Sequence, residues 1–104
     1  MSQVEQTSPD QRTAEVDVTV EYVAATTPFR RKYPETTVVE TVRTDAMAYF
    51  GVRDRVERNT YTYYLAFEGQ RITNTSQTLQ TLLGEHRRGA KFNLIEEIKP
   101  GGVL

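Results

Sequence analysis

The sequence predicts a small α+β domain in which one amphipathic helix packs across a mixed sheet. Three observations carry this prediction. Apolar and polar residues alternate over 16–22, a helical pattern covers 38–50, and segments rich in strand-forming residues follow at 60–67 and 92–98. Strands before and after a single long helix are typical of a sheet that carries the helix on one face.

The first elements are a predicted hairpin of two strands. Its first strand alternates four apolar residues with polar ones, as a half-buried strand does: Val16, Val18, Val20 and Tyr22. Residues 24–28 predict a turn, and residues 29–33 predict the second strand. Pro34 is expected to end that strand, because proline cannot donate to the ladder of hydrogen bonds.

The helix is predicted from about Val38 to Phe50. Thr36 or Thr37 is expected to cap it, with Glu40 completing a capping box, and Gly51 is expected to end it. Its apolar face consists of Val39, Val42, Ala46 and Phe50, with Met47 and Tyr49 at the edges.

The second half of the chain predicts a connector, further strands and one short helical turn. Residues 52–59 are charged and predict a connector, whereas 60–67 predict a strand followed by a turn and a short return strand at 71–73. Leu79, Leu82 and Leu83 predict a helical turn that Gly84 closes. The last strand is expected from Phe92 to Ile98.

Length and composition limit the function. The 104 residues suit one domain, with flexible tails predicted at 1–14 and 99–104 around a domain at 15–98. The 13 basic and 14 acidic residues argue against a nucleic-acid partner. The absence of cysteine excludes disulfides and thiolate chemistry. No apolar run begins the chain, so we expect no membrane partner and a cytoplasmic location.

The sequence resembles the ubiquitin-like β-grasp proteins over about residues 15–102. Leu65-Ala66-Phe67-Glu68-Gly69-Gln70-Arg71-Ile72 is similar to a strand–turn–strand of ubiquitin, and Thr78-Leu79 with Leu82 to the segment that follows. Phe92-Asn93-Leu94-Ile95 is similar to its last strand, and Gly101-Gly102 to its tail. The chain most resembles a bacterial ubiquitin-like protein modifier, and some such systems are linked to phage defence.

The resemblance implies that this chain is a substrate and not an enzyme. A metal-dependent deconjugating peptidase would cut between Gly102 and Val103. An activating enzyme would adenylate Gly102 with ATP, and a conjugating enzyme would pass it to an amine of a target protein. Gly101 would share in this conjugation site. The chain itself would hold no catalytic residue, metal or cofactor, and its only histidine, His86, has no evident catalytic partner.

The resemblance also implies surfaces for these partners. Outward positions of the sheet would expose Tyr64, Ala66 and Ile95 together. The root of the tail would contact the activating enzyme through Glu96, Glu97, Ile98, Lys99 and Pro100. The two glutamates stand where ubiquitin is basic, which indicates a different set of partners.

Two other functions are compatible with the same pattern. The chain could be a β-grasp interaction module that binds partners through its sheet and is never conjugated. It could also be a sulfur carrier, although sulfur carriers usually end at the second glycine, and Val103 and Leu104 follow it here.

Overall fold

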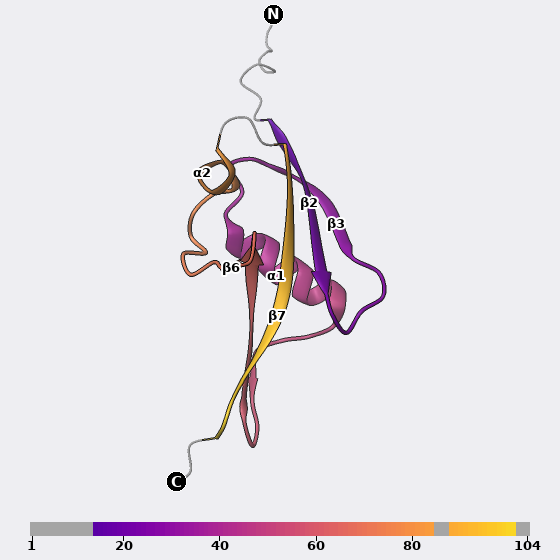
Figure 1. Ribbon diagram of the computed structural model, residues 1–104, viewed down its shortest axis with the longest axis vertical. Coiled ribbons are helices and arrows are strands. Elements are labelled where there is room, and N and C mark those ends of the chain that lie inside the picture. Colours follow the sequence, from indigo (N-terminus) through magenta and orange to yellow (C-terminus); the bar gives the residue numbers. More distant parts are fainter. Residues whose placement is uncertain (1–13, 85–87, 102–104) are drawn as a thin grey trace, which may run out of the picture.

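The computed structural model describes residues 14–84 and 88–101. It confirms the predicted α+β class and mixed sheet, with the elements in the order drawn in Figure 1. These elements are β2 (Glu15–Tyr22), β3 (Phe29–Pro34), α1 (Val39–Phe50), β4 (Arg55–Val56), β5 (Thr60–Phe67), β6 (Gln70–Arg71), α2 (Leu79–Leu83) and β7 (Gly89–Lys99). The predicted N-terminal tail, apart from Ala14, lies outside the described residues.

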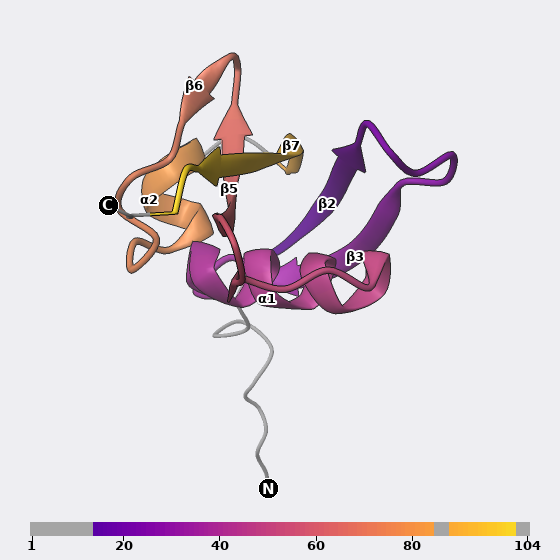
Figure 2. The same cartoon turned by 90° about the horizontal axis from the view of Figure 1, so that it is seen from below.

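The sheet has β2 and β7 side by side at its centre. Its strand order is β3-β2-β7-β5-β4, and β6 pairs with β5. β2 and β7 run parallel, whereas the β2–β3, β4–β5, β5–β6 and β5–β7 pairs are antiparallel. The long helix α1 lies across one face of this sheet (Figure 2).

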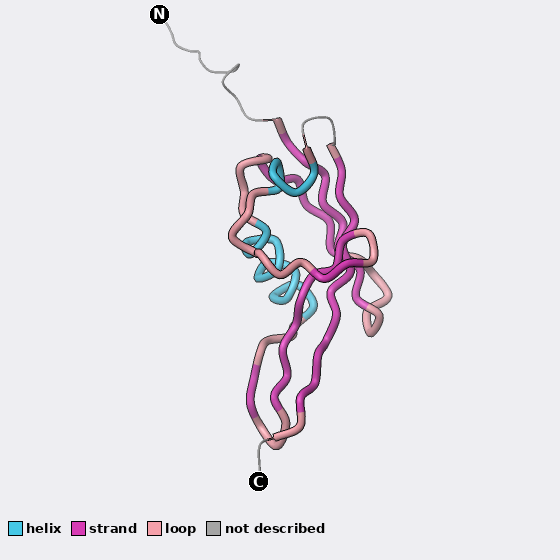
Figure 3. Tube along the Cα trace, turned by 60° about the vertical axis from the view of Figure 1, so that its left-hand side comes forward, coloured by secondary structure: helices cyan, strands magenta, loops and turns pink. Residues whose placement is uncertain are grey.

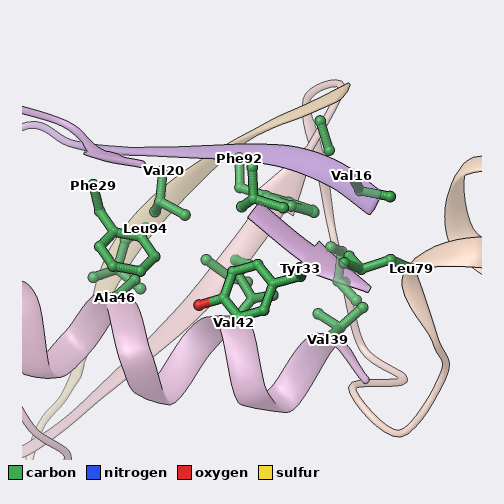
Figure 4. Close-up of a cluster of buried hydrophobic side chains, with 14 of the residues drawn as sticks. Val16, Val20, Phe29, Tyr33, Val39, Val42, Ala46, Leu79, Phe92 and Leu94 are labelled. Carbon is green, nitrogen blue, oxygen red and sulfur yellow. The ribbon is translucent and has the colours of Figure 1, made fainter. Parts of the chain in front are cut away.

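The core lies between α1 and the inner face of the sheet (Figure 4). The helix buries Val39, Val42, Ala46 and Met47. The sheet buries Val16, Val18, Val20, Phe29, Tyr33, Tyr63, Leu65, Phe92 and Leu94. The helix face and the alternation of β2 predicted from the sequence are confirmed, and Phe50 and Phe67 pack against the core as half-buried side chains.

The helix begins as predicted but is capped differently. Val38 is its N-cap residue, and no side chain caps it, so the predicted capping box from Thr37 to Glu40 is wrong. The amides of Val39 and Glu40 instead donate to the carbonyl oxygens of Gln77 and Thr75, each at 2.9 Å. Because the loop before α2 supplies these acceptors, the first amides of the helix need no capping side chain.

Several boundaries in the second half differ from the prediction. Within the segment expected to be a connector, residues 55–56 form β4, which makes a hairpin with β5. The return strand β6 covers Gln70–Arg71, and α2 ends at Gly84 as predicted. Lys99, assigned to the tail from the sequence, is the last residue of β7.

No helix in residues 14–84 and 88–101 is both long enough and apolar enough to cross a membrane.

Candidate functional site

At one end the sheet narrows to a ribbon formed by β4, β5 and the end of β7, and the C-terminal residues follow from this ribbon. In this C-terminal ribbon (residues 55–63 and 95–101), Thr60 lies opposite Lys99 and Tyr61 opposite Ile98. β4 lies on the other side of β5, with Val56 opposite Thr60. Figure 3 shows the ribbon extending beyond α1 to the end of the molecule opposite α2. The diglycine segment therefore starts far from the helical end of the domain.

The β4–β5 hairpin lies directly against the start of this segment. The backbone N–H of Gly101 donates to the side-chain Oδ1 of Asn59 at 3.3 Å. The hairpin turn is closed by a hydrogen bond of 2.8 Å from the N–H of Glu57 to the carbonyl oxygen of Asn59. Sequence reasoning missed this contact, since Val56 is the only apolar residue among 53–59 and gives a weak strand signal.

Tyr63 connects all three strands on the inner face of the ribbon. Its hydroxyl donates to Oε2 of Glu96 at 2.7 Å and accepts from Nη1 of Arg55 at 3.2 Å. The guanidinium of Arg55 also lies 3.9 Å from the ring centroid of Tyr61. Burial and the hydrogen bond to Glu96 raise the pKa of Tyr63, against the opposing effect of the hydrogen bond from Arg55. Glu96 is thus tied to the hairpin.

Glu97 points to the opposite face and has a different partner. Its Oε1 lies 3.2 Å from Nη1 of Arg71 on β6. The guanidinium of Arg71 also lies 4.2 Å from the ring centroid of Tyr64. The adjacent glutamates therefore do not form one acidic patch, because successive residues of a strand point to opposite faces.

The predicted apolar patch is smaller than expected. Tyr64 and Ile95 lie opposite each other on the outer face and are half-buried. The prediction that Ala66 is exposed with them is wrong, because only 6% of its surface is accessible. Ala66 lies between Asn93 and Arg71 in the sheet, and its single methyl group is shorter than both of these neighbouring side chains.

A polar clamp fastens the hairpin to α1. The N–H of Tyr63 donates to Oδ1 of Asp54 at 3.1 Å, and its carbonyl oxygen accepts from Nε of Arg43 at 2.8 Å. Arg43 Nη2 and Asp54 Oδ2 are 2.6 Å apart, and Arg43 Nη1 also pairs with Glu40 at 2.8 Å. Arg43 and Asp54 thereby occupy the edge of β5 between its partners β4 and β6.

The remaining predicted site residues divide into two groups. Ile98, Lys99, Pro100 and Gly101 are exposed, as a segment that meets a partner must be. Gly102 and Val103, and also His86, lie outside the described residues. Among the residues that the structure does describe, no three His, Asp or Glu side chains gather in a metal-binding group.

Solved structures of similar fold are ubiquitin-like proteins. A ubiquitin from Caldiarchaeum subterraneum aligns with a TM-score of 0.61 and 22% identity over 86% of this chain and 100% of its own. The ubiquitin-like domain from tubulin-binding cofactor B gives 0.57 and 19% over 81% and 91%. The ubiquitin-like domain of an Arabidopsis thaliana protein gives 0.55 and 13% over 91% and 90%. No protein-family model matches the chain, and no curated protein does either.

These likenesses establish the fold. The chain has an α+β ubiquitin-like fold, with a mixed sheet on one main helix. At this level of identity they establish no activity, because one fold serves many functions.

Proposed function

We propose that this chain is a ubiquitin-like protein modifier of the cytoplasm. It is cut after Gly102, adenylated by an activating enzyme and joined through Gly102 to amines of target proteins. The observation that carries this proposal is the position of the diglycine. Gly101 and Gly102 follow the last strand of a ubiquitin-like fold, and Gly101 is exposed at the far end of the C-terminal ribbon.

The chemistry needs little from the chain itself. A carboxylate is a poor acyl donor until ATP converts it to an acyl adenylate, from which a thiol and then an amine can take the acyl group. The activating and conjugating enzymes supply these catalytic groups. A glycine carboxylate suits such enzymes because a backbone without Cβ can approach closely inside a narrow channel.

The C-terminal ribbon offers the activating enzyme two distinct faces. Ile98 is 51% exposed on the inner face, beside Tyr61. Glu97 and Lys99 lie on the outer face, opposite Thr62 and Thr60. We propose that the cognate enzyme recognises this arrangement together with Pro100, and that a basic surface of the enzyme meets Glu97 on the outer face.

Cleavage by the metal-dependent peptidase tests the maturation step. Intact-mass measurement should show loss of Val103 and Leu104 from the full chain. The Gly102→Ala variant should be cut more slowly, because the added methyl group crowds a site shaped for glycine. A chain that keeps both residues, yet is still activated, would contradict processing at this bond.

A noncovalent interaction module is the second candidate, and one observation favours it. Tyr64 and Ile95 form a half-buried apolar pair on the open face of the sheet. Ile95→Arg should keep the fold and weaken binding to a conjugating enzyme or peptidase, as measured by titration calorimetry. Thr19→Arg, at another half-buried position of the sheet, is the control. If only the noncovalent interaction is found and no thioester forms, the module is the better description.

A further inference from the structure

Gly101 differs from most other glycines that the structure describes. Gly51, Gly69 and Gly84 have φ angles of 74°, 81° and 82°, and a Cβ at any of them would meet open space. Those glycines are required by backbone conformation. The φ of Gly101 lies outside this left-handed region. Its backbone conformation therefore does not demand glycine.

The space around Gly101 does demand glycine. A Cβ built on it would overlap the carbonyl oxygen of Arg58 and lie 3.1 Å from the carbonyl carbon. Both atoms belong to the backbone of the β4–β5 hairpin, so they cannot move aside as the end of a flexible side chain can. A Cβ on Gly89, the first residue of β7, would have only an ordinary contact of 3.6 Å with the carbonyl oxygen of Asp17.

The hairpin also holds Gly101 by a hydrogen bond and is itself held in place. Oδ1 of Asn59 accepts from the Gly101 N–H, and Asn59 is half-buried. Within the hairpin, Arg55 on β4 contacts Tyr61 and Tyr63 on β5. Asp54, at the base of the hairpin, pairs with Arg43 on α1. The support under Gly101 is therefore continuous with the body of the domain.

We propose that the β4–β5 hairpin supports the chain at Gly101 and fixes its position after β7. Asn59 is a positioning residue that holds Gly101, and Arg58 requires glycine there by close backbone contact. Gly101 is thus glycine because of this chain's own fold, whatever an enzyme requires of it. Where the proposed modifier function holds, the receiving enzyme must also accommodate Glu57 and Arg58, which are exposed beside the segment.

The exchange of the Gly101 amide proton with water, measured by NMR on the full chain, tests the hydrogen bond. Asn59→Ala should speed this exchange by about two- to tenfold, the effect of losing one hydrogen bond. Asn59→Asp should retain slow exchange because it keeps an acceptor. Asn74→Ala is the matched control, because Asn74 Oδ1 accepts from the Ser76 N–H at 3.1 Å in a distant loop. Equal exchange rates in the wild type and Asn59→Ala would overturn the proposal.

The steric part is tested by two alanine substitutions on the same spectra. Gly101→Ala should shift the amide resonances of Arg58 and Asn59, because the hairpin and the segment must separate. Gly89→Ala should leave those resonances in place. If Gly101→Ala leaves them unchanged as well, the hairpin does not require glycine. Both measurements use the free chain, so they are decided independently of whether Gly102 is ever activated.

Discussion

Tyr63 makes more connections than any other single residue of the C-terminal ribbon. Its hydroxyl group joins Arg55 to Glu96. Its backbone N–H donates to Asp54, and its carbonyl oxygen accepts from Arg43. One tyrosine thus links α1, the hairpin and the last strand.

Removal of the Tyr63 hydroxyl gives a prediction about pH. Because the pKa of Tyr63 is raised in the folded chain, its contribution to stability is full below the ordinary tyrosine pKa of 10.0 and is lost as pH rises above it. Tyr63→Phe removes both hydrogen bonds of the hydroxyl and should cost about 1–3 kcal/mol at neutral pH, since each bond contributes about 0.5–1.5 kcal/mol. Urea unfolding at about pH 7 and about pH 11 should show a smaller alkaline loss in the variant. An equal loss in both proteins would contradict this role.

Ala66 is a residue whose burial is not evident from the sequence. The alternation of β5 correctly places it on the outer face. Its exposure depends on which residue of β6 lies opposite, and that residue is the long Arg71. The register of a two-residue strand has no periodic signal, so the burial of Ala66 could not be predicted.

At the scale of elements, β5 has a gap in its pairing that side chains fill. On the edge away from β7, β4 pairs with residues 60–61 and β6 with residues 66–67. Between them, Asp54 and Arg43 bind the backbone of Tyr63. Unpaired strand edges recruit other strands, so this polar clamp also protects the sheet.

Loss of the clamp should loosen the hairpin and open the edge. Asp54→Ala leaves the Tyr63 N–H without its acceptor and Arg43 without its closest partner. We expect faster exchange of the Tyr63 amide and more self-association, measured by NMR and by sedimentation. Asp17→Ala, which removes an exposed carboxylate 3.7 Å from Lys32 on the other side of the sheet, is the control. Identical behaviour of the two variants would rule out the edge-protecting role.

The elements differ in how far the sequence predicts them. Long periodic segments such as β2, α1 and β5 are predicted closely, because burial of one face imposes a period. β4 gives no such signal, because two residues cannot display a period, and the preceding residue Asp54 pairs with Arg43, which is distant in the sequence. The capping of α1 was predicted wrongly for the same reason, since its acceptors come from residues 75 and 77.

At the scale of the whole molecule, stability rests in the core between α1 and the sheet. Leu65 is fully buried there, so Leu65→Ala should cost about 2–5 kcal/mol through lost burial and a cavity. Val56→Ala, at a side chain that is 77% exposed, should change stability by less than about 0.5 kcal/mol. Chemical denaturation of both variants checks this. Similar effects would mean that Leu65 is not part of the core.

The core and the C-terminal ribbon differ in how far the sequence predicts them. The core supports a fold seen in proteins of 13–22% identity. In the C-terminal ribbon, the β4–β5 hairpin contacts Gly101 through Asn59. The sequence alone predicts the diglycine and its position after the last strand, whereas the contact with Asn59 required the structure.

Thioester formation is the most direct test of the modifier function. The chain ending at Gly102 and the full chain are each incubated with the activating enzyme and ATP, and the products are separated without reducing agent. We expect an enzyme thioester with the shortened chain, and with the full chain only after the peptidase is added. Hydroxylamine or thiol should release it. If the shortened chain forms no thioester, although its fold is intact and the enzyme is active on ATP, the chain is not a modifier activated at Gly102.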